Sequence, residues 1–485
     1  MSTSTEVKRD GRFFGHPLGL TNLFGVELWE RFSFYGMIGI LPIYLYYSAA
    51  EGGLDVARPT ALGIVGAYSG LVYLSSTMGS WVADRLLGSE RTLFYSAILV
   101  MVGHIGLAVV PGLLGVGIGL VCVAVGSGGL KANATTIVGT LYEKDDPRID
   151  AGFTIFYIGV NVGGWLGPLL TGLAQEKVNF HLGFGLAAIG MALGLVQYTL
   201  GRKNLGGKAS EVPNPLPPEQ RVRFGLGALA GVVVIVAVFV SGLVTAEGLP
   251  DAVLVLVGAV AVIYFAVILS SGKITADERS RVWSFVPMFI ASAAFFSLYQ
   301  QQATVVIAYS DERLDRNLFG WEMPVSWTSS INPVFIILLG GVFATIWTKL
   351  GNRQPSTPAK FAYGTIIMGI AFLLFLPMIH TGENGSPLLA LIGILFVFTI
   401  GEMMLSPVGL AVSTKLAPTA FRSQMVALNF LSISFGSAMS GKLAQNYSTT
   451  NEGPYFGVIG GVAIAIGVVL ALCIPFIRKQ MKGVH

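Results

Sequence analysis

The sequence predicts an all-α membrane protein made of two six-helix bundles and an inserted two-helix hairpin, with fourteen transmembrane helices in all. Only 12% of the 485 residues are charged and 53% are hydrophobic, whereas soluble domains carry about 25% charged residues. Long apolar runs such as 93–120 are separated by short polar breaks, and roughly 20 apolar residues suffice to cross a bilayer as a helix. The 62 glycines are typical of membrane helices that pack closely.

One polar, proline-rich segment, residues 201–223, divides the chain, because six apolar spans precede it and eight follow. We therefore expect an N-terminal six-helix bundle over residues 1–201, a cytoplasmic linker over 202–223, an inserted hairpin over 224–272 and a C-terminal six-helix bundle over 273–485. Two bundles joined in this way are typical of alternating-access carriers. The predicted spans are residues 22–48, 60–83, 91–110, 113–140, 151–174, 182–201, 224–246, 250–271, 282–309, 328–349, 361–379, 387–414, 421–445 and 455–477.

Lysines and arginines are distributed unevenly among the predicted loops. Most of the 30 lie in segments on the same side of the membrane as the N-terminus. Cytoplasmic loops carry an excess of these residues, so both termini are predicted to be cytoplasmic. The polar N-terminal segment has no apolar core and is not expected to be a cleaved signal peptide. The exceptions to the charge bias are the loop residues Arg58, Lys177, Arg313 and Arg316 and the intramembrane residues Arg31, Lys131 and Lys442.

The first span holds the densest set of intramembrane charges, Glu27, Glu30 and Arg31. Spacings of three and four residues place all three on one helix face. Two carboxylates that share one cation cannot both ionise at low cost, so the set predicts a protonatable site with its own counter-ion. A structural salt bridge that holds the first helix in place is the alternative.

Two further intramembrane charges lie far apart in the sequence. Lys131 follows a glycine-rich stretch in the fourth span, and Glu402 lies in a span of the C-terminal half. Buried charges are costly and are functional candidates by default. Lys131 could instead extend to the membrane surface, and Glu402 could be a protonated carboxyl that donates to a backbone carbonyl. A zwitterion with a carboxylate and an amine, such as a short peptide or an amino acid, would match one cation and one anion on different bundles.

Other classes of function have little support in the sequence. Four of the five histidines are terminal or in loops, and His104 stands alone in its span, where a packing role is the more frequent one. Cys122 and Cys473 lie in apolar segments, so neither a disulfide framework nor a metal site is expected. No protease or esterase motif occurs in a suitable context. The basic residues are spread over the loops and do not indicate nucleic-acid binding, and a receptor would not need charges divided between bundles.

Several motifs resemble those of one family. Residues 27–36, ELWERFSFYG, resemble the ExxERFxYYG signature of the proton-dependent oligopeptide transporters, a branch of the major facilitator superfamily. Residues 79–88 are similar to the loop between the second and third helices of that superfamily. Residues 153–161 resemble the FSIFYxxIN segment of the family, and 330–333 and 401–407 its C-terminal motifs. The helix count is similar to that of bacterial members, which insert a helix pair.

The resemblance implies a proton-coupled symporter that imports di- and tripeptides across the bacterial inner membrane as a monomer. No cofactor is implied, since protons are the coupling ion. The residues implied in proton coupling are Glu27, Glu30, Arg31 and Lys131. Those implied in substrate binding are Tyr35, Tyr73, Lys131, Asn161, Gln300, Asn332, Glu402 and Asn429. The alternative is a carrier of the same fold for another small zwitterion or anion, such as an amino acid derivative, a peptide-like drug or nitrate.

Some positions depart from the family pattern. Phe34 replaces a tyrosine of the signature, and Ile38 replaces an arginine that commonly follows it. Residues 299–302 read YQQQ where the family usually has an acidic residue before glutamine. In the family, this arginine and this acidic residue are suggested to pair across the outer side of the cavity, where they form a gate. Because both are absent here, no charge is left unpaired, and we expect glutamine hydrogen bonds or apolar contact at that gate. Phe296 and Asn429 stand where tryptophans are usual, which predicts altered side-chain pockets.

Overall fold

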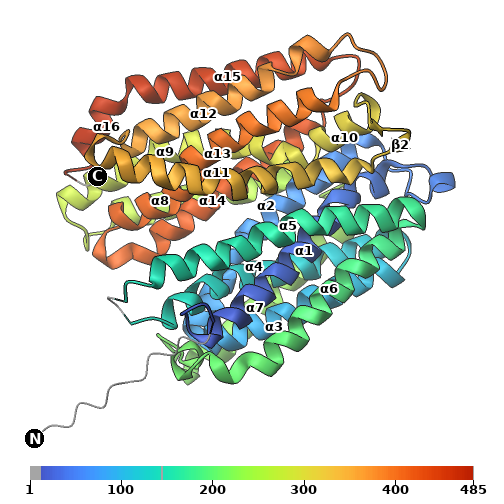
Figure 1. Cartoon of the computed structure of the whole chain (residues 1–485). Coiled ribbons are helices and arrows are strands. Elements are labelled where there is room, and N and C mark those ends of the chain that lie inside the picture. The colour runs from blue at the N-terminus through green and yellow to red at the C-terminus, as the bar shows by residue number, and fades with distance from the viewer. Residues whose placement is uncertain (1–12, 144–145, 484–485) are drawn as a thin grey trace, which may run out of the picture. The chain divides into compact units, whose positions relative to one another are not determined.

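The computed structural model describes residues 13–143 and 146–483 and is almost wholly helical (Figure 1). A two-stranded antiparallel hairpin, β1 (Asn317–Leu318) and β2 (Trp321–Glu322), is the sheet that the described residues form. The helices are α1 (Leu18–Tyr46), α2 (Arg58–Val82), α3 (Ser89–Val109), α4 (Gly112–Thr140), α5 (Ile149–Lys177), α6 (Phe180–Gly201), α7 (Pro218–Val240), α8 (Leu249–Ser270), α9 (Ala276–Tyr299), α10 (Val305–Glu312), α11 (Ile331–Leu350), α12 (Thr357–Leu373), α13 (Leu388–Leu416), α14 (Arg422–Ala444), α15 (Glu452–Leu472) and α16 (Ile474–Gln480).

A long helix coincides with each predicted span, to within about six residues at each end. In the described residues, 12 helices are long and apolar enough to cross a membrane. Two more long helices complete the predicted set: α1, which carries three charges, and α14, which is rich in serine. The span predicted over 282–309 is α9 continued by α10, with a 3₁₀ turn at Gln300–Ala303 between them. The prediction of cytoplasmic termini concerns in part the first and last residues of the chain. These residues lie outside the described ranges.

The chain forms two compact units, which we describe separately. The first comprises Met1–Met37, Ser75–Thr171 and His181–Gly225. The second comprises Ile38–Leu74, Gly172–Phe180 and Leu226–His485. The second unit therefore contains the turn between α1 and α2 as well as every helix from α8 onward.

Glycines allow the helices within each unit to approach closely. In the first unit, a Cβ on Gly79 of α2 would overlap the Cα of Gly129 in α4. In the second unit, a Cβ on Gly66 of α2 would overlap the Cα of Gly441 in α14. Side chains of any size would force these backbones apart, which is why small residues are favoured at membrane helix contacts. The high glycine content thus serves helix packing, as the sequence predicts.

The proline-rich linker is attached to the turn between α2 and α3. The backbone N–H of Asn214 donates to the carbonyl of Asp84 at 3.0 Å, and that of Leu216 donates to the carbonyl of Arg85 at 2.8 Å. Gly88 has a φ of +80°, and a Cβ there would lie 2.7 Å from the Ser210 carbonyl oxygen. The second half of the linker is therefore held in place by backbone hydrogen bonds.

The two helices after the linker differ in how they are packed. None of the described residues in the most apolar stretch of α7 is buried, whereas 22% of the corresponding stretch of α8 is. Lys442 of α14 forms an ion pair with Asp251 of α8 at 2.7 Å, and Gln445 donates to the Glu247 carbonyl just before α8. These contacts attach α8 to α14 within the second unit.

Candidate functional site

A buried charge cluster lies in the middle of α1. The Nε of Arg31 is 2.7 Å from Oε1 of Glu27 and 3.1 Å from Oε2 of Glu30. Ser127 of α4 donates its hydroxyl to Oε1 of Glu30 at 2.8 Å. All three charged residues are buried. The predicted sharing of one helix face is therefore seen in the structure, and Glu27 and Glu30 share Arg31 as their cation.

Lys131 lies one helical turn after Ser127 on α4, at a half-buried position. Its charge is close enough to Glu30 to interact with that carboxylate. The α1 carboxylates and Arg31 together carry one excess negative charge, and Lys131 or a proton can balance it. The cluster can therefore hold or release one positive charge without leaving a buried ion uncompensated.

Glu402 occupies a different kind of environment in the second unit. The hydroxyl of Tyr299 in α9 donates to Oε1 of Glu402 at 3.0 Å. The amide of Asn332 in α11 donates to Oε2 of Glu402 at 3.3 Å and to the hydroxyl of Thr399 at 3.0 Å. Within the described residues no lysine or arginine forms an ion pair with Glu402. Both oxygens accept from neutral side chains, and a carboxyl that donates to a backbone carbonyl stays the alternative.

A buried carboxylate with only neutral donors retains its attraction for a cation, because neutral hydrogen bonds compensate burial only in part. Glu402 is 6% exposed. An ammonium group that reached it would complete the missing charge balance. The arrangement can therefore bind an amine.

The remaining predicted residues are distributed over both units. Tyr35 in α1 is half-buried, and buried Asn161 in α5 donates to the Tyr157 carbonyl at 2.9 Å; both belong to the first unit. The second unit holds half-buried Tyr73, together with Gln300, which donates to Ser437 at 2.9 Å, and buried Asn429, whose Oδ1 would lie 2.8 Å from a Cβ on Gly409.

A polar cluster joins the α1–α2 turn to the end of α10, all within the second unit. We call Tyr46, Tyr47, Arg58, Asp311 and Glu312 the Asp311 cluster. The hydroxyls of Tyr46 and Tyr47 donate to Asp311 at 2.9 and 2.7 Å. Arg58 at the start of α2 forms an ion pair with Glu312 and lies 4.6 Å from the centre of the Tyr46 ring. These contacts hold the ends of α1 and α2 against α10.

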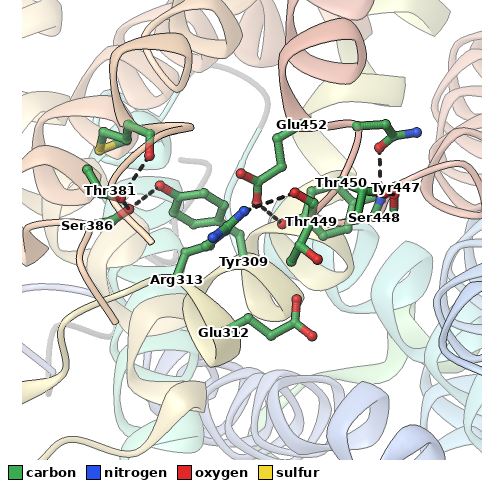
Figure 2. A network of polar contacts seen from close by, with 12 residues as sticks. Tyr309, Glu312, Arg313, Thr381, Ser386, Tyr447, Ser448, Thr449, Thr450 and Glu452 are labelled. Atoms are coloured by element: carbon green, nitrogen blue, oxygen red, sulfur yellow. Dashed lines mark hydrogen bonds and ion pairs between the residues drawn. The ribbon is translucent and has the colours of Figure 1, made fainter. Parts of the chain in front are cut away.

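Arg313, the residue after the cluster, contacts the start of α15 and the loop before it. Its Nε donates to Oε1 of Glu452 at 3.0 Å and its Nη2 to the Thr449 carbonyl at 2.9 Å, as Figure 2 shows. The hydroxyl of Tyr447 donates to the same Glu452 oxygen at 2.9 Å. Burial and the Glu452 carboxylate raise the pKa of Tyr447, so its hydroxyl remains a donor. We call Arg313, Tyr447, Thr449 and Glu452 the Arg313 network.

The hydrogen bonds of the glutamine run differ from those expected at the gate. Gln300 donates to Ser437 of α14, Gln302 donates to the Tyr299 carbonyl, and Gln301 accepts from Tyr455 of α15. The contacts to the ends of α1 and α2 are made instead by the Asp311 cluster. The expectation of glutamine hydrogen bonds or apolar contact at this place stays a prediction, and the Asp311 cluster adds ionic contacts at the ends of α1 and α2.

The sequence reasoning missed three kinds of residue. Ser127 could have been found, because it precedes Lys131 by one turn. Tyr299 and Thr399 gave no signal, since Tyr299 is distant in sequence from its partner Glu402 and Thr399 is distant from its partner Asn332. The run of three charges at 311–313 directly after an apolar helix was visible in the sequence.

Histidine and metal chemistry have a plain outcome in the described residues. No group of three or more His, Cys, Asp or Glu side chains could hold a metal ion. His104 is fully buried, and neither ring nitrogen has a hydrogen-bond partner. A satisfied packing residue was expected here; His104 is buried as expected, but its polar atoms are not satisfied.

Comparison with known proteins gives consistent matches over the whole chain. The model of the POT family (PTR2) matches residues 90–459. A di-/tripeptide transporter of Lactococcus lactis subsp. cremoris is 38% identical, over 99% of both chains. An uncharacterized transporter of Bacillus subtilis, YclF, is 43% identical over 97% of this chain and 96% of its own. A crystal structure of a peptide transporter POT with sulfate has a TM-score of 0.93 at 43% identity and covers 97% of each chain.

Proposed function

The chain belongs to the POT family, and from this membership we propose that it imports di- and tripeptides together with protons. It is a multi-pass membrane transporter of the major facilitator fold and a secondary carrier rather than an enzyme. The observation that carries the proposal is the pair of unlike charges: the Lys131 ammonium on α4 beside the α1 cluster, and the Glu402 carboxylate held by neutral donors.

We place the protein in the bacterial inner membrane with both termini in the cytoplasm, as a monomer. The distribution of lysine and arginine supports this orientation. The α1–α2 turn and the Asp311 cluster then lie on the outer side. Their hydrogen bonds and ion pair would keep the outer ends of α1, α2 and α10 together while the carrier releases cargo inward.

The α1 cluster is the proposed proton site. When Lys131 turns to a bound carboxylate, the excess negative charge shared by Glu27 and Glu30 loses its compensation. A proton then restores the balance, because an uncompensated buried charge is costly. Proton binding and cargo binding would thus favour one another, which is the requirement for symport.

The two ends of a peptide match the two charge sites. Lys131 would receive the peptide carboxylate, and Glu402, supported by Asn332, would receive the amino end. Tyr35, Tyr73, Asn161, Gln300 and Asn429 would contact the remainder of the peptide. We further propose the bundle limits given above, with residues 1–201 and 273–485 as the two bundles that alternate.

A smaller zwitterion is the second candidate cargo. A POT family transporter that is 39% identical to this chain, with a TM-score of 0.91, has been solved in complex with 5-aminolevulinic acid. Another solved relative, a mutant of a peptide transporter POT at 44% identity, is in complex with alafosfalin. Both ligands are compatible with sites for an amine and an anionic group.

Uptake into proteoliposomes tests the proposal. We expect radiolabelled dialanine to accumulate under an inward proton gradient and 5-aminolevulinic acid to accumulate less. Glu30→Gln keeps an acceptor for Ser127 and is expected to abolish accumulation while sparing peptide exchange. Glu402→Gln is expected to raise KM about tenfold or more, since a charge-assisted hydrogen bond contributes about 1.5–3 kcal/mol.

Glu219→Gln is the matched control, since Glu219 is an exposed carboxylate in the first turn of α7. It should transport like the unmodified protein. Uptake of dialanine that ignores the gradient would remove proton coupling from the proposal. Stronger accumulation of 5-aminolevulinic acid than of any dipeptide would replace the cargo.

A further inference from the structure

A fixed ammonium group lies where α11 meets α12. The Nζ of Lys360, in the first turn of α12, is 4.2 Å from the centre of the Trp347 ring in the last turns of α11. It donates to Oε1 of Gln354 at 2.8 Å, and Nε2 of Gln354 donates to the Trp347 carbonyl at 2.9 Å. Trp347 and Gln354 therefore hold the ammonium in one position, and two of its three donors remain for other acceptors.

Further cations gather at this place. Lys415, in the last turn of α13, is close enough to Lys360 for their charges to repel, and α11 packs against α13. Lys349 and Arg353 are exposed at the end of α11 and in the turn that follows. In the described part of the chain, no carboxylate forms an ion pair with Lys349, Arg353 or Lys360. We call these four cations, with Trp347 and Gln354, the Lys360 site.

The chain offers few acids that could neutralise the Lys360 site. No Asp or Glu occurs at 323–382 or at 403–451. At the start of α9, Asp277 pairs with Lys482 at 3.3 Å, and Glu278 accepts from Thr275 and from the backbone N–H of Thr419. Because Lys349, Arg353 and Lys360 have no ion-pair partner among the described residues, an anion from outside the chain would stabilise them.

The surface next to the site indicates where that anion comes from. Only 22% of the most apolar stretch of α11 is buried. Leu338, Val342 and Ile346 are exposed along α11 and lead towards Trp347 and Lys349. An exposed apolar helix surface that ends in tryptophan and lysine is typical of the boundary between acyl chains and headgroups. The anion nearest to such a boundary is the phosphate of a lipid.

We propose that the Lys360 site binds the headgroup phosphate of an acidic phospholipid, with one acyl chain along the exposed surface of α11. Lys360 supplies the fixed donors, and Lys349, Arg353 and Lys415 supply additional positive charge. Basic residues near a membrane surface attract anionic lipids in this way. The proposal depends on the membrane fold and not on the peptide cargo, so it stands or falls independently of the proposed transport function.

Native mass spectrometry of the purified full chain tests the site. The protein in mild detergent is titrated with phosphatidylglycerol, with phosphatidylcholine and with inorganic phosphate. We expect phosphatidylglycerol adducts at concentrations at least tenfold below those needed for phosphatidylcholine. Lys360→Gln should lower phosphatidylglycerol retention about fivefold or more, while Lys360→Arg should retain most of it.

Lys479→Gln is the matched control, since Lys479 is an exposed lysine in α16, outside the Lys360 site. Equal loss of phosphatidylglycerol in Lys479→Gln and Lys360→Gln would overturn the proposal in favour of diffuse charge attraction. Retention of phosphatidylcholine at the same concentrations would also overturn it. Displacement of the lipid by millimolar inorganic phosphate would assign the site to a free anion instead. Monodisperse elution of each variant shows that the comparison is made on folded protein.

Discussion

Asp311→Asn is the substitution expected to weaken the contact between the α1–α2 turn and α10. The carboxylate of Asp311 accepts hydrogen bonds from the hydroxyls of Tyr46 and Tyr47 at 2.9 and 2.7 Å. Asparagine has nearly the same shape but carries no charge. It also replaces one acceptor oxygen by a nitrogen that can only donate.

The loss can be estimated for each hydrogen bond. A hydrogen bond to a charged group contributes about 1.5–3 kcal/mol, and a neutral one about 0.5–1.5 kcal/mol. The introduced asparagine would keep one tyrosine at about 1 kcal/mol less and would lose the other bond, about 2 kcal/mol. Asp311 is half-buried, so water replaces part of the loss. We therefore expect the contact between the α1–α2 turn and α10 to weaken by about 2 kcal/mol. This corresponds to a roughly 30-fold shift of the equilibrium towards a state in which the two have separated.

Spin-label distances measure this shift. Cysteines are placed at exposed Glu51 and Phe319, and native Cys122 and Cys473 are changed to serine. Double electron–electron resonance on the labelled protein should show mainly one short distance. In Asp311→Asn, a longer distance should become a major component.

Asp315→Asn serves as the control, because exposed Asp315 lies near Asp311 in the chain and accepts from the backbone of Asn317 instead. Its distance distribution should match that of the unmodified protein. The reasoning is refuted if Asp311→Asn leaves the distribution unchanged, or if Asp315→Asn changes it equally.

Three further substitutions probe packing and charge. Glu452→Gln removes the carboxylate partner of Arg313 and should destabilise the protein by about 2 kcal/mol, less than for a fully buried pair because Arg313 is partly exposed; a thermal midpoint equal to the unmodified one would contradict this. Tyr447→Phe should lower the thermal midpoint by an amount that stays constant between about pH 6 and about pH 9. The pKa of Tyr447 is raised, so its contribution is complete below the unfolded value near about pH 10 and is lost only above it. A difference that varied within this range would argue against the Glu452 contact. Gly79→Ala should cost about 1–3 kcal/mol, because its Cβ would press on the Gly129 backbone; unchanged thermal unfolding would show that α2 and α4 can separate freely.

The helices and their order were predictable because hydropathy and charge bias depend on local composition. The split of one predicted span into α9 and α10 was not, since the 3₁₀ turn at Gln300–Ala303 interrupts an otherwise apolar span for only four residues. A mean over many residues does not resolve so short a turn.

The charged residues of the candidate site were predictable, because the free-energy cost of burying a charge in a membrane marks them as functional candidates. Glu27, Glu30 and Arg31 are close in sequence, so helix periodicity predicts their contact. The two partners of Glu402, Tyr299 and Asn332, lie on two other helices, and one sequence gives no information on which faces meet. The Asp311 cluster shows the same limit, because its members come from residues 46–58 and 311–312 and depend on tertiary packing.

The attached linker has a consequence for motion in the chain. Leu216 is hydrogen-bonded to the α2–α3 turn, and α7 begins at Pro218. Only Pro217 therefore separates this attached residue from the start of α7. The ring of Phe224 in α7 also stacks on Trp81 at 4.2 Å. The start of α7 is therefore fastened to the end of α2 by backbone and ring contacts, so the proline-rich segment is not a free tether.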